Sequence, residues 1–236
     1  PFVICYKNKL PRLIDLRYII LPSILLLIYN IAFFKGTYFG LAGKGAILVT
    51  TLNPLFTVII MAIINRGILR KEVLGVLLGI IGGVIIMNIH TEGFGQLLKS
   101  GNLYFIICAI SWGVMSVAIT YAQKIINPYV FICICYFFTM LMSIPFIDLN
   151  AIFTSNLVCK FYLNFFFLSL GAMSFGTSIY IYYTPILGPS KASIFIFSVP
   201  FLAISIANVF LNEPFTFNIV IGGILSLFAI YIVNRK

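Results

Sequence analysis

Charged residues, and acidic ones above all, are scarce in this chain. Only 20 of its 236 residues are Asp, Glu, Lys or Arg, and only five of these are acidic. Soluble domains carry charge at about 25% of their positions, so this chain lacks the polar surface of a soluble fold. It has one His and no clustered metal ligands, and it contains no Walker loop or Gly-x-Ser-x-Gly turn. The sequence therefore predicts no metal site, no cofactor and no enzyme activity.

Long apolar runs take the place of the missing charge. Hydrophobic residues make up 62% of the chain and form eight blocks of about 17 to 22 residues, separated by short charged links. About 20 residues of α-helix cross a hydrocarbon core of ~30 Å. We therefore predict an all-α integral membrane protein, a helical bundle with eight transmembrane helices, at residues 18–38, 45–64, 73–89, 103–122, 129–147, 162–183, 192–211 and 215–233.

The basic residues concentrate on alternate links. Links on one predicted face hold eleven Lys and Arg residues, whereas those on the other face hold only Lys44, Lys99 and Lys160. Because basic links stay in the cytoplasm, we expect a multi-pass protein of the cell (inner) membrane with both chain ends cytoplasmic. The net charge of +10 is then explained by topology and lipid contacts, and no nucleic-acid partner is expected.

Two stretches of the chain share one order of features. Each has a basic residue, an apolar block interrupted by proline, a link and a glycine-containing block. Pro54 and Pro200 are 146 residues apart, and Gly75 and Gly222 are 147 apart. The first copy begins on the predicted outer face and the second on the cytoplasmic face, so the pattern predicts inverted repeats. Such repeats are common in secondary transporters, where the substrate site lies near the membrane midplane.

Short motifs support the same interpretation. They are TPILGPSKAS at residues 184–193, VPF at 199–201, LNEP at 211–214, a glycine pair at 222–223 and AISWG at 109–113. In their order and spacing they resemble the EamA-type branch of the drug/metabolite transporter superfamily. The resemblance implies ten helices in two inverted halves, of which this chain would hold helices three to ten. It implies an incomplete first repeat at residues 1–89, with the end of helix two at 1–6, an external link at 90–102 and a second repeat at 103–236.

The expected function is secondary transport of small organic metabolites, for example amino acids or nucleotides, by alternating access. No predicted span carries a carboxylate of the kind proton-coupled antiporters use, which favours facilitated diffusion or exchange. The alternatives are a non-transporting fragment, a membrane subunit that depends on a partner, and less readily a lipid-linked transferase, which would need clustered acids or a nucleophile with a base. Expected partners are a small-molecule substrate and the lipid bilayer, and a homodimer is left open.

Lys35 is the one basic residue inside a predicted span. A lysine at the centre of a membrane helix costs ~2.5 to 3.5 kcal/mol to insert, so it usually faces a cavity or a partner. The alternative is that its long side chain reaches the nearby interface, because the block ends three residues later. We interpret Lys35 as a substrate-binding candidate that would suit a carboxylate or phosphate.

Other polar groups in the spans complete the predicted substrate site. Asn53 is costly in lipid, and Trp112, the only tryptophan, lies away from the interfacial belt where tryptophan usually anchors. Thr50 and Tyr180 are also candidates, although such groups mostly hydrogen-bond within or between helices. Pro54 and Pro200 are predicted hinges or kinks, because proline removes a backbone hydrogen bond from a helix.

Overall fold

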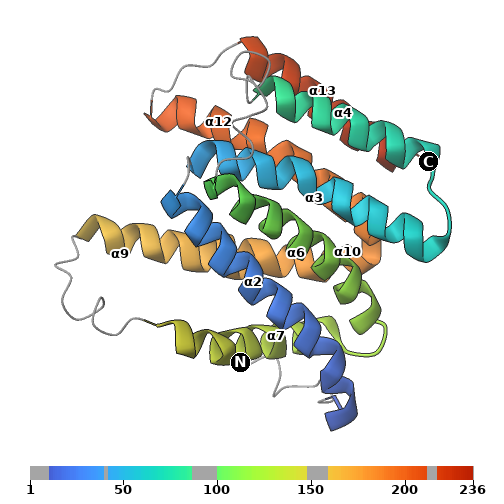
Figure 1. Cartoon of the computed structure of the whole chain (residues 1–236), viewed down its shortest axis with the longest axis vertical. Helices are drawn as coiled ribbons and strands as arrows, with labels where there is room; N and C mark the ends of the chain where they lie inside the picture. The colour runs from blue at the N-terminus through green and yellow to red at the C-terminus, as the bar shows by residue number, and fades with distance from the viewer. Residues whose placement is uncertain (1–10, 40–41, 87–99, 148–158, 212–216, 236) are drawn as a thin grey trace.

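The architecture is a bundle of helices that lie side by side (Figure 1). The computed structural model describes residues 11–39, 42–86, 100–147, 159–211 and 217–235, and all regular structure within these ranges is helical. Within the same ranges, six helices are long and apolar enough to cross a membrane. The protein is therefore an all-α, multi-pass membrane protein, as the composition predicts.

Helical structure coincides with each predicted apolar block. The regular helices are α2 (Arg17–Phe39), preceded by the short turn η1 (Leu13–Leu16), α3 (Ala42–Asn65), α4 (Arg70–Ile86), α6 (Ser100–Ala122), α7 (Pro128–Ser143), continued by η3 (Ile144–Phe146), and α13 (Phe217–Asn234). The predicted block at 73–89 and the predicted external link at 90–102 extend into residues outside the described ranges. The described part of α4 has 17 residues, so α4 is not one of the six long spans.

Two of the blocks are helical but irregular. One runs through α9 (Cys159–Phe166), a π-helical segment η4 (Phe167–Gly176) and α10 (Thr177–Leu187). The next consists of α11 (Pro189–Ile194), the 3-10 turn η5 (Phe195–Phe197) and α12 (Ser198–Leu211). Gly188 joins the two at φ 88° and ψ 143°, a backbone region that residues with a side chain rarely enter.

α4 and α13 pack in opposite directions through small residues. A side chain at Gly75, near the start of α4, would collide with Val233 near the end of α13. A side chain at Gly222, near the start of α13, would collide with Ile86 at the end of α4. Each helix therefore presents an early glycine to the last turn of the other. This close packing is the role that glycine commonly has between membrane helices.

α6 packs between α2 and α3. Gly36, late in α2, lies against Phe105, early in α6, so these two helices are antiparallel. Gly113 of α6 lies against Phe56 and Thr57 of α3, while Phe105 shares a cluster with Leu48, so α3 and α6 run in the same direction. Consequently α2 and α4 begin, and α3, α6 and α13 end, at one end of the bundle.

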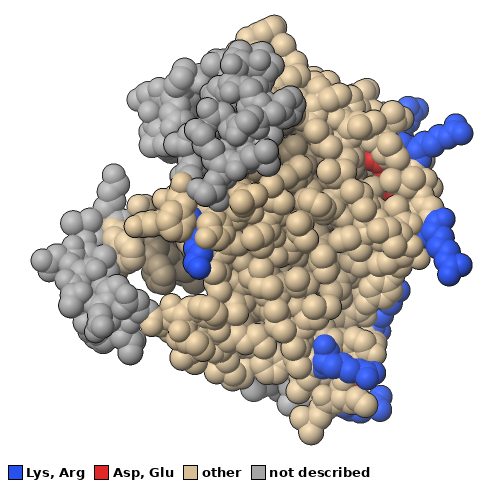
Figure 2. All heavy atoms as spheres, viewed as in Figure 1, with Lys and Arg blue, Asp and Glu red and all other residues tan. Residues whose placement is uncertain are grey.

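Basic side chains gather at that end of the bundle. Figure 2 shows them along the right-hand edge, where α3 ends, α4 begins and the C terminus lies in Figure 1. Nζ of Lys71 donates a hydrogen bond to the backbone carbonyl of Arg235 at 3.3 Å, which ties the start of α4 to the residue after α13. The described links and helix ends at this side carry Arg12, Arg17, Arg66, Arg70, Lys71, Lys124, Lys191 and Arg235.

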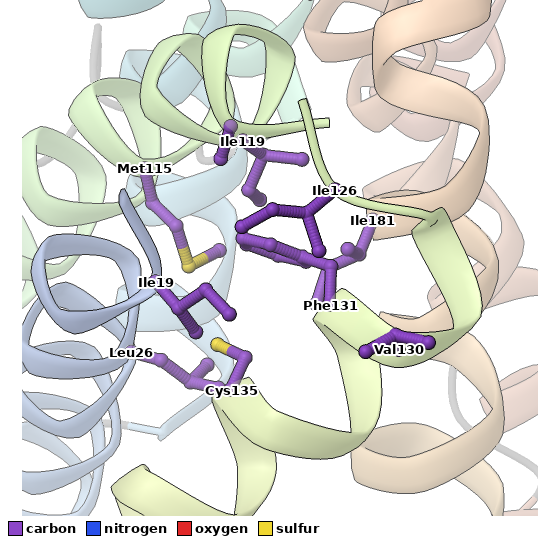
Figure 3. Packing of buried hydrophobic residues seen from close by; sticks show 10 residues of the cluster. Ile19, Leu26, Met115, Ile119, Ile126, Val130, Phe131, Cys135 and Ile181 are labelled. Atoms are coloured by element: carbon purple, nitrogen blue, oxygen red, sulfur yellow. The ribbon is translucent and has the colours of Figure 1, made fainter. Parts of the chain in front are cut away.

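A hydrophobic cluster fixes α7 and α10 to α2 and α6 (Figure 3). Its members point toward one another from all four helices, and the side chains of Ile19, Met115, Phe131 and Ile181 are fully buried. The cluster therefore sets the rotation of each helix about its own axis. That rotation decides which polar side chains reach the cavity described next.

Candidate functional site

A cavity of about 180 Å³ lies between α2, α6, α7 and the segment formed by η4 and α10. Its aromatic and amide lining consists of Tyr29, Asn30, Phe33 and Phe34 of α2, Trp112 of α6 and Tyr136 of α7. η4 and the start of α10 complete the wall with small and apolar residues and one hydroxyl group. Tyr29 and Trp112 lie close to the middle of their helices, so the cavity lies near mid-depth in the bundle.

Trp112 is held between two tyrosine rings. Its ring centroid lies 4.7 Å from that of Tyr29 and 5.1 Å from that of Tyr180, and both pairs are tilted. The hydroxyl of Ser116 donates to the Trp112 carbonyl at 2.8 Å and lies 2.7 Å from the Tyr180 hydroxyl. Because the serine has one proton, the tyrosine is the donor of the second bond. The sequence predicted both Trp112 and Tyr180 as site residues. The structure brings the two into contact, and Trp112 lines the cavity.

The π-helical wall of the cavity is tied to α7. The Tyr136 hydroxyl donates to the Met173 carbonyl at 2.7 Å and accepts a bond from the Ser178 hydroxyl at 3.3 Å. The Thr177 hydroxyl donates to the Ala172 carbonyl, five residues earlier, at 3.3 Å. π-helical turns are rare and occur frequently at functional sites. Nothing in the apolar sequence of this segment distinguishes a π turn from an α turn, so sequence reasoning missed both it and Tyr136.

Lys35 does not line the cavity. It is exposed, and it follows Phe34 on α2, so it projects about 100° further round the helix than that cavity residue. The lining residues Leu26, Tyr29, Asn30 and Phe33 instead follow the i, i+3 and i+4 spacing of one helical face. Asn30 contributes an amide to this face. Its position on one helical face with the aromatic residues Tyr29 and Phe33 is the feature of the sequence that could have identified it as a cavity residue.

α3 places the other two predicted polar residues away from the cavity. Asn53 is 2% exposed, and its side-chain oxygen accepts a hydrogen bond from the Thr57 hydroxyl at 3.3 Å. Thr57 lies in turn against Gly113 of α6, so Asn53 is close to a helix contact. The Thr50 hydroxyl donates to the Ile47 carbonyl at 3.0 Å within α3. Neither Asn53 nor Thr50 is a lining residue of the described cavity.

The two predicted kink residues differ in their surroundings. Pro54 is buried inside α3, which stays helical on both sides of it. Pro200 follows the 3-10 turn η5, where the helical path from α11 to α12 is interrupted. A proline at position 200 has no N–H for the carbonyl four residues earlier, which explains an interruption there.

Residues 99–235 match the EamA-like transporter family, and this match covers more than half of the chain. The chain belongs to the EamA-like transporter family. The matched segment of this EamA-like protein includes Trp112, Tyr136 and Tyr180, whereas Tyr29 and Asn30 lie before it. No curated protein sequence matches the chain.

Solved structures share the fold of this EamA-like protein. One crystal structure, described only as that of a protein, has 18% sequence identity and a TM-score of 0.73. The match covers 92% of this chain and 75% of the other chain. At this identity the likeness establishes the fold, and it says nothing about the substrate.

Proposed function

We propose that this protein is a secondary transporter that moves small organic metabolites across the membrane by alternating access. The observation that carries the proposal is the cavity at mid-depth, walled by α2 on one side and by α6, α7 and α10 on the other. α2 belongs to the predicted first repeat and the other three helices to the predicted second one. A substrate bound there would touch both halves, so rocking of one half against the other would expose it to each face in turn.

The packing of α4 against α13 supports inverted halves. Gly75 meets Val233 and Gly222 meets Ile86. Gly222 follows Gly75 by 147 residues, and Val233 follows Ile86 by the same number. Swapping the two repeats therefore turns the first contact into the second, as expected for two units related by a two-fold axis. The equivalent helices α4 and α13 are antiparallel, as a two-fold axis in the membrane plane requires.

We further propose eight membrane spans and a cytoplasmic location for both chain ends, in a cell inner membrane. α4 and the α11–α12 path would be the two spans that add to the six long helices. The gathering of basic residues at the end of the bundle where α2 and α4 begin supports this orientation, because positive links stay on the cytoplasmic side. Tyr38, at the far end of α2, would then lie near the opposite face.

Within this site we assign substrate contact to Trp112 and its positioning to Tyr180. Tyr180 does not line the cavity, but it packs against the Trp112 ring and bonds to Ser116, which bonds to the Trp112 backbone. Lys35, Asn53 and Thr50 lie outside the lining, so their predicted substrate contacts are not part of this assignment.

Exchange in proteoliposomes tests the function. Vesicles with the purified protein are loaded with single unlabelled metabolites, and entry of the same labelled metabolite is compared with protein-free vesicles. We expect at least one metabolite to exchange, with Trp112→Ala reducing exchange at least tenfold. Phe137→Leu is the matched control, because Phe137 is 53% exposed and does not line the cavity. Failure of every metabolite in a broad panel would refute the transport function.

A further inference from the structure

The lining of the cavity between α2, α6, α7 and α10 has polar groups but no charged side chain among its described residues. An ion that leaves water for such a place loses its hydration, and the lining offers no opposite charge in return. An anion then has no compensation, whereas the faces of the aromatic rings would replace part of the hydration of a cation. Lys35, the basic residue of α2 nearest in sequence to the lining, is exposed and lies outside it. The cavity therefore disfavours carboxylates and phosphates most strongly, and ammonium groups to a smaller degree, since no carboxylate is present among the described lining residues to pair with them.

The shape of the lining favours a flat ring. Tyr29, Phe33, Phe34, Trp112 and Tyr136 contribute aromatic groups, and the Tyr29 and Phe33 rings are stacked at 5.9 Å. Aromatic rings attract one another in offset or edge-to-face contacts. The volume of about 180 Å³ suits a single ring, since an apolar cavity of ~150 Å³ accommodates benzene.

Two hydroxyl groups of the wall are already used, whereas the buried Nε1–H of Trp112 has no hydrogen-bond partner among the described residues. Tyr136 donates to Met173, and Thr177 donates to Ala172, so both hydroxyl protons are committed to the backbone. The amide of Asn30 can both donate and accept a hydrogen bond. It therefore suits a hydroxyl, amide or ring nitrogen on an otherwise apolar solute.

We propose that this cavity binds uncharged planar solutes of about one ring, packed against Trp112 and Tyr29 and hydrogen-bonded by Asn30. The proposal rests on the transport function above and names its substrate class. It differs from the expectation drawn from Lys35, which favoured an anionic solute.

Trp112 provides the test, because it is the only tryptophan in the chain. Its fluorescence, excited at a wavelength that the ligands do not absorb, is followed in purified protein during titration with three matched probes. Benzyl alcohol is uncharged, benzoate is anionic and benzylamine is cationic at neutral pH. We expect a saturable change with benzyl alcohol at concentrations at least tenfold below those needed for either charged probe.

Two variants separate specific binding from partition into detergent. Asn30→Leu keeps the size of the side chain and removes the hydrogen bond, so benzyl alcohol should bind about fivefold more weakly. Phe137→Leu, outside the cavity, should bind as the wild type does. Equal binding of benzoate and benzyl alcohol, equal titrations of wild type and Asn30→Leu, or no saturable change would each overturn the substrate class.

Uptake measurements distinguish failure of the class from failure of the function. Proteoliposomes that exchange only charged metabolites would refute the uncharged ring class while transport stands. Saturable binding of benzyl alcohol without exchange of any metabolite would support the cavity's chemistry and refute transport.

Discussion

Gly82 of α4 and Gly222 of α13 face each other so closely that neither has room for a side chain. A Cβ atom at Gly82 would lie 2.7 Å from the carbonyl oxygen of Gly222, and one at Gly222 would lie 2.6 Å from the carbonyl oxygen of Gly82. A helical carbonyl cannot swing aside as a flexible side chain can. The crossing of the two helices therefore depends on both glycines.

Gly222→Ala is expected to destabilise the protein by about 1 to 3 kcal/mol, because the added methyl forces the two backbones apart. The measurement is the unfolding midpoint of the purified protein in detergent. Gly171→Ala in η4 is the matched control, since a Cβ there would meet nothing within 4 Å. Equal midpoints for Gly222→Ala and the wild type would show that the helices do not pack this closely.

Cysteine labelling is expected to place Gly67 and Tyr38 on opposite faces of the membrane. Gly67 lies in the basic link between α3 and α4 with open space around it, and Tyr38 is 82% exposed at the other end of α2. With the five native cysteines replaced, a membrane-impermeant maleimide should label Tyr38→Cys in intact spheroplasts. Gly67→Cys should react only after the membrane is opened. Labelling of both cysteines in intact spheroplasts would contradict the proposed topology.

Lys35→Met is expected to leave exchange within about twofold of the wild type. Lys35 is exposed on α2 beside the cavity residue Phe34, and its long side chain can carry the charge to the interface. Initial exchange rates in proteoliposomes, corrected for the amount of protein inserted, provide the comparison. A tenfold loss, with Lys35→Arg active, would restore Lys35 as a substrate contact.

Hydropathy was enough to locate the helices. The predicted blocks at 18–38 and 103–122 became α2 and α6 with ends shifted by at most three residues, because a run of apolar residues has few alternatives to helix in a bilayer. The same uniform hydrophobicity hides how each helix is turned. A span that is apolar all round has no polar stripe to mark its packed face.

This explains which residues of the cavity lining could be predicted. Trp112 could be predicted to line a cavity because a tryptophan away from the interface is unusual at any rotation of its helix. Lys35 and Asn30 are five residues apart on one helix, and only the packing around Ile19 and Leu26 determines that the amide, and not the lysine, faces the cavity. The π-helical segment left no trace in the sequence, since the hydroxyl that bonds to its backbone belongs to Tyr136 on another helix.

Tyr136→Phe is expected to loosen η4 from α7. The variant removes the donor to the Met173 carbonyl while keeping the ring in the cavity wall. A hydrogen bond between membrane helices contributes about 0.6 to 2 kcal/mol, so backbone amides of residues 167–176 should exchange with deuterium about 3- to 30-fold faster. Tyr183→Phe is the control, because Tyr183 is half exposed and does not line the cavity. If the deuterium exchange of these amides is the same in Tyr136→Phe and the wild type, η4 keeps its π-helical form without this hydrogen bond. Any loss of transport in the variant would then arise from the changed cavity wall.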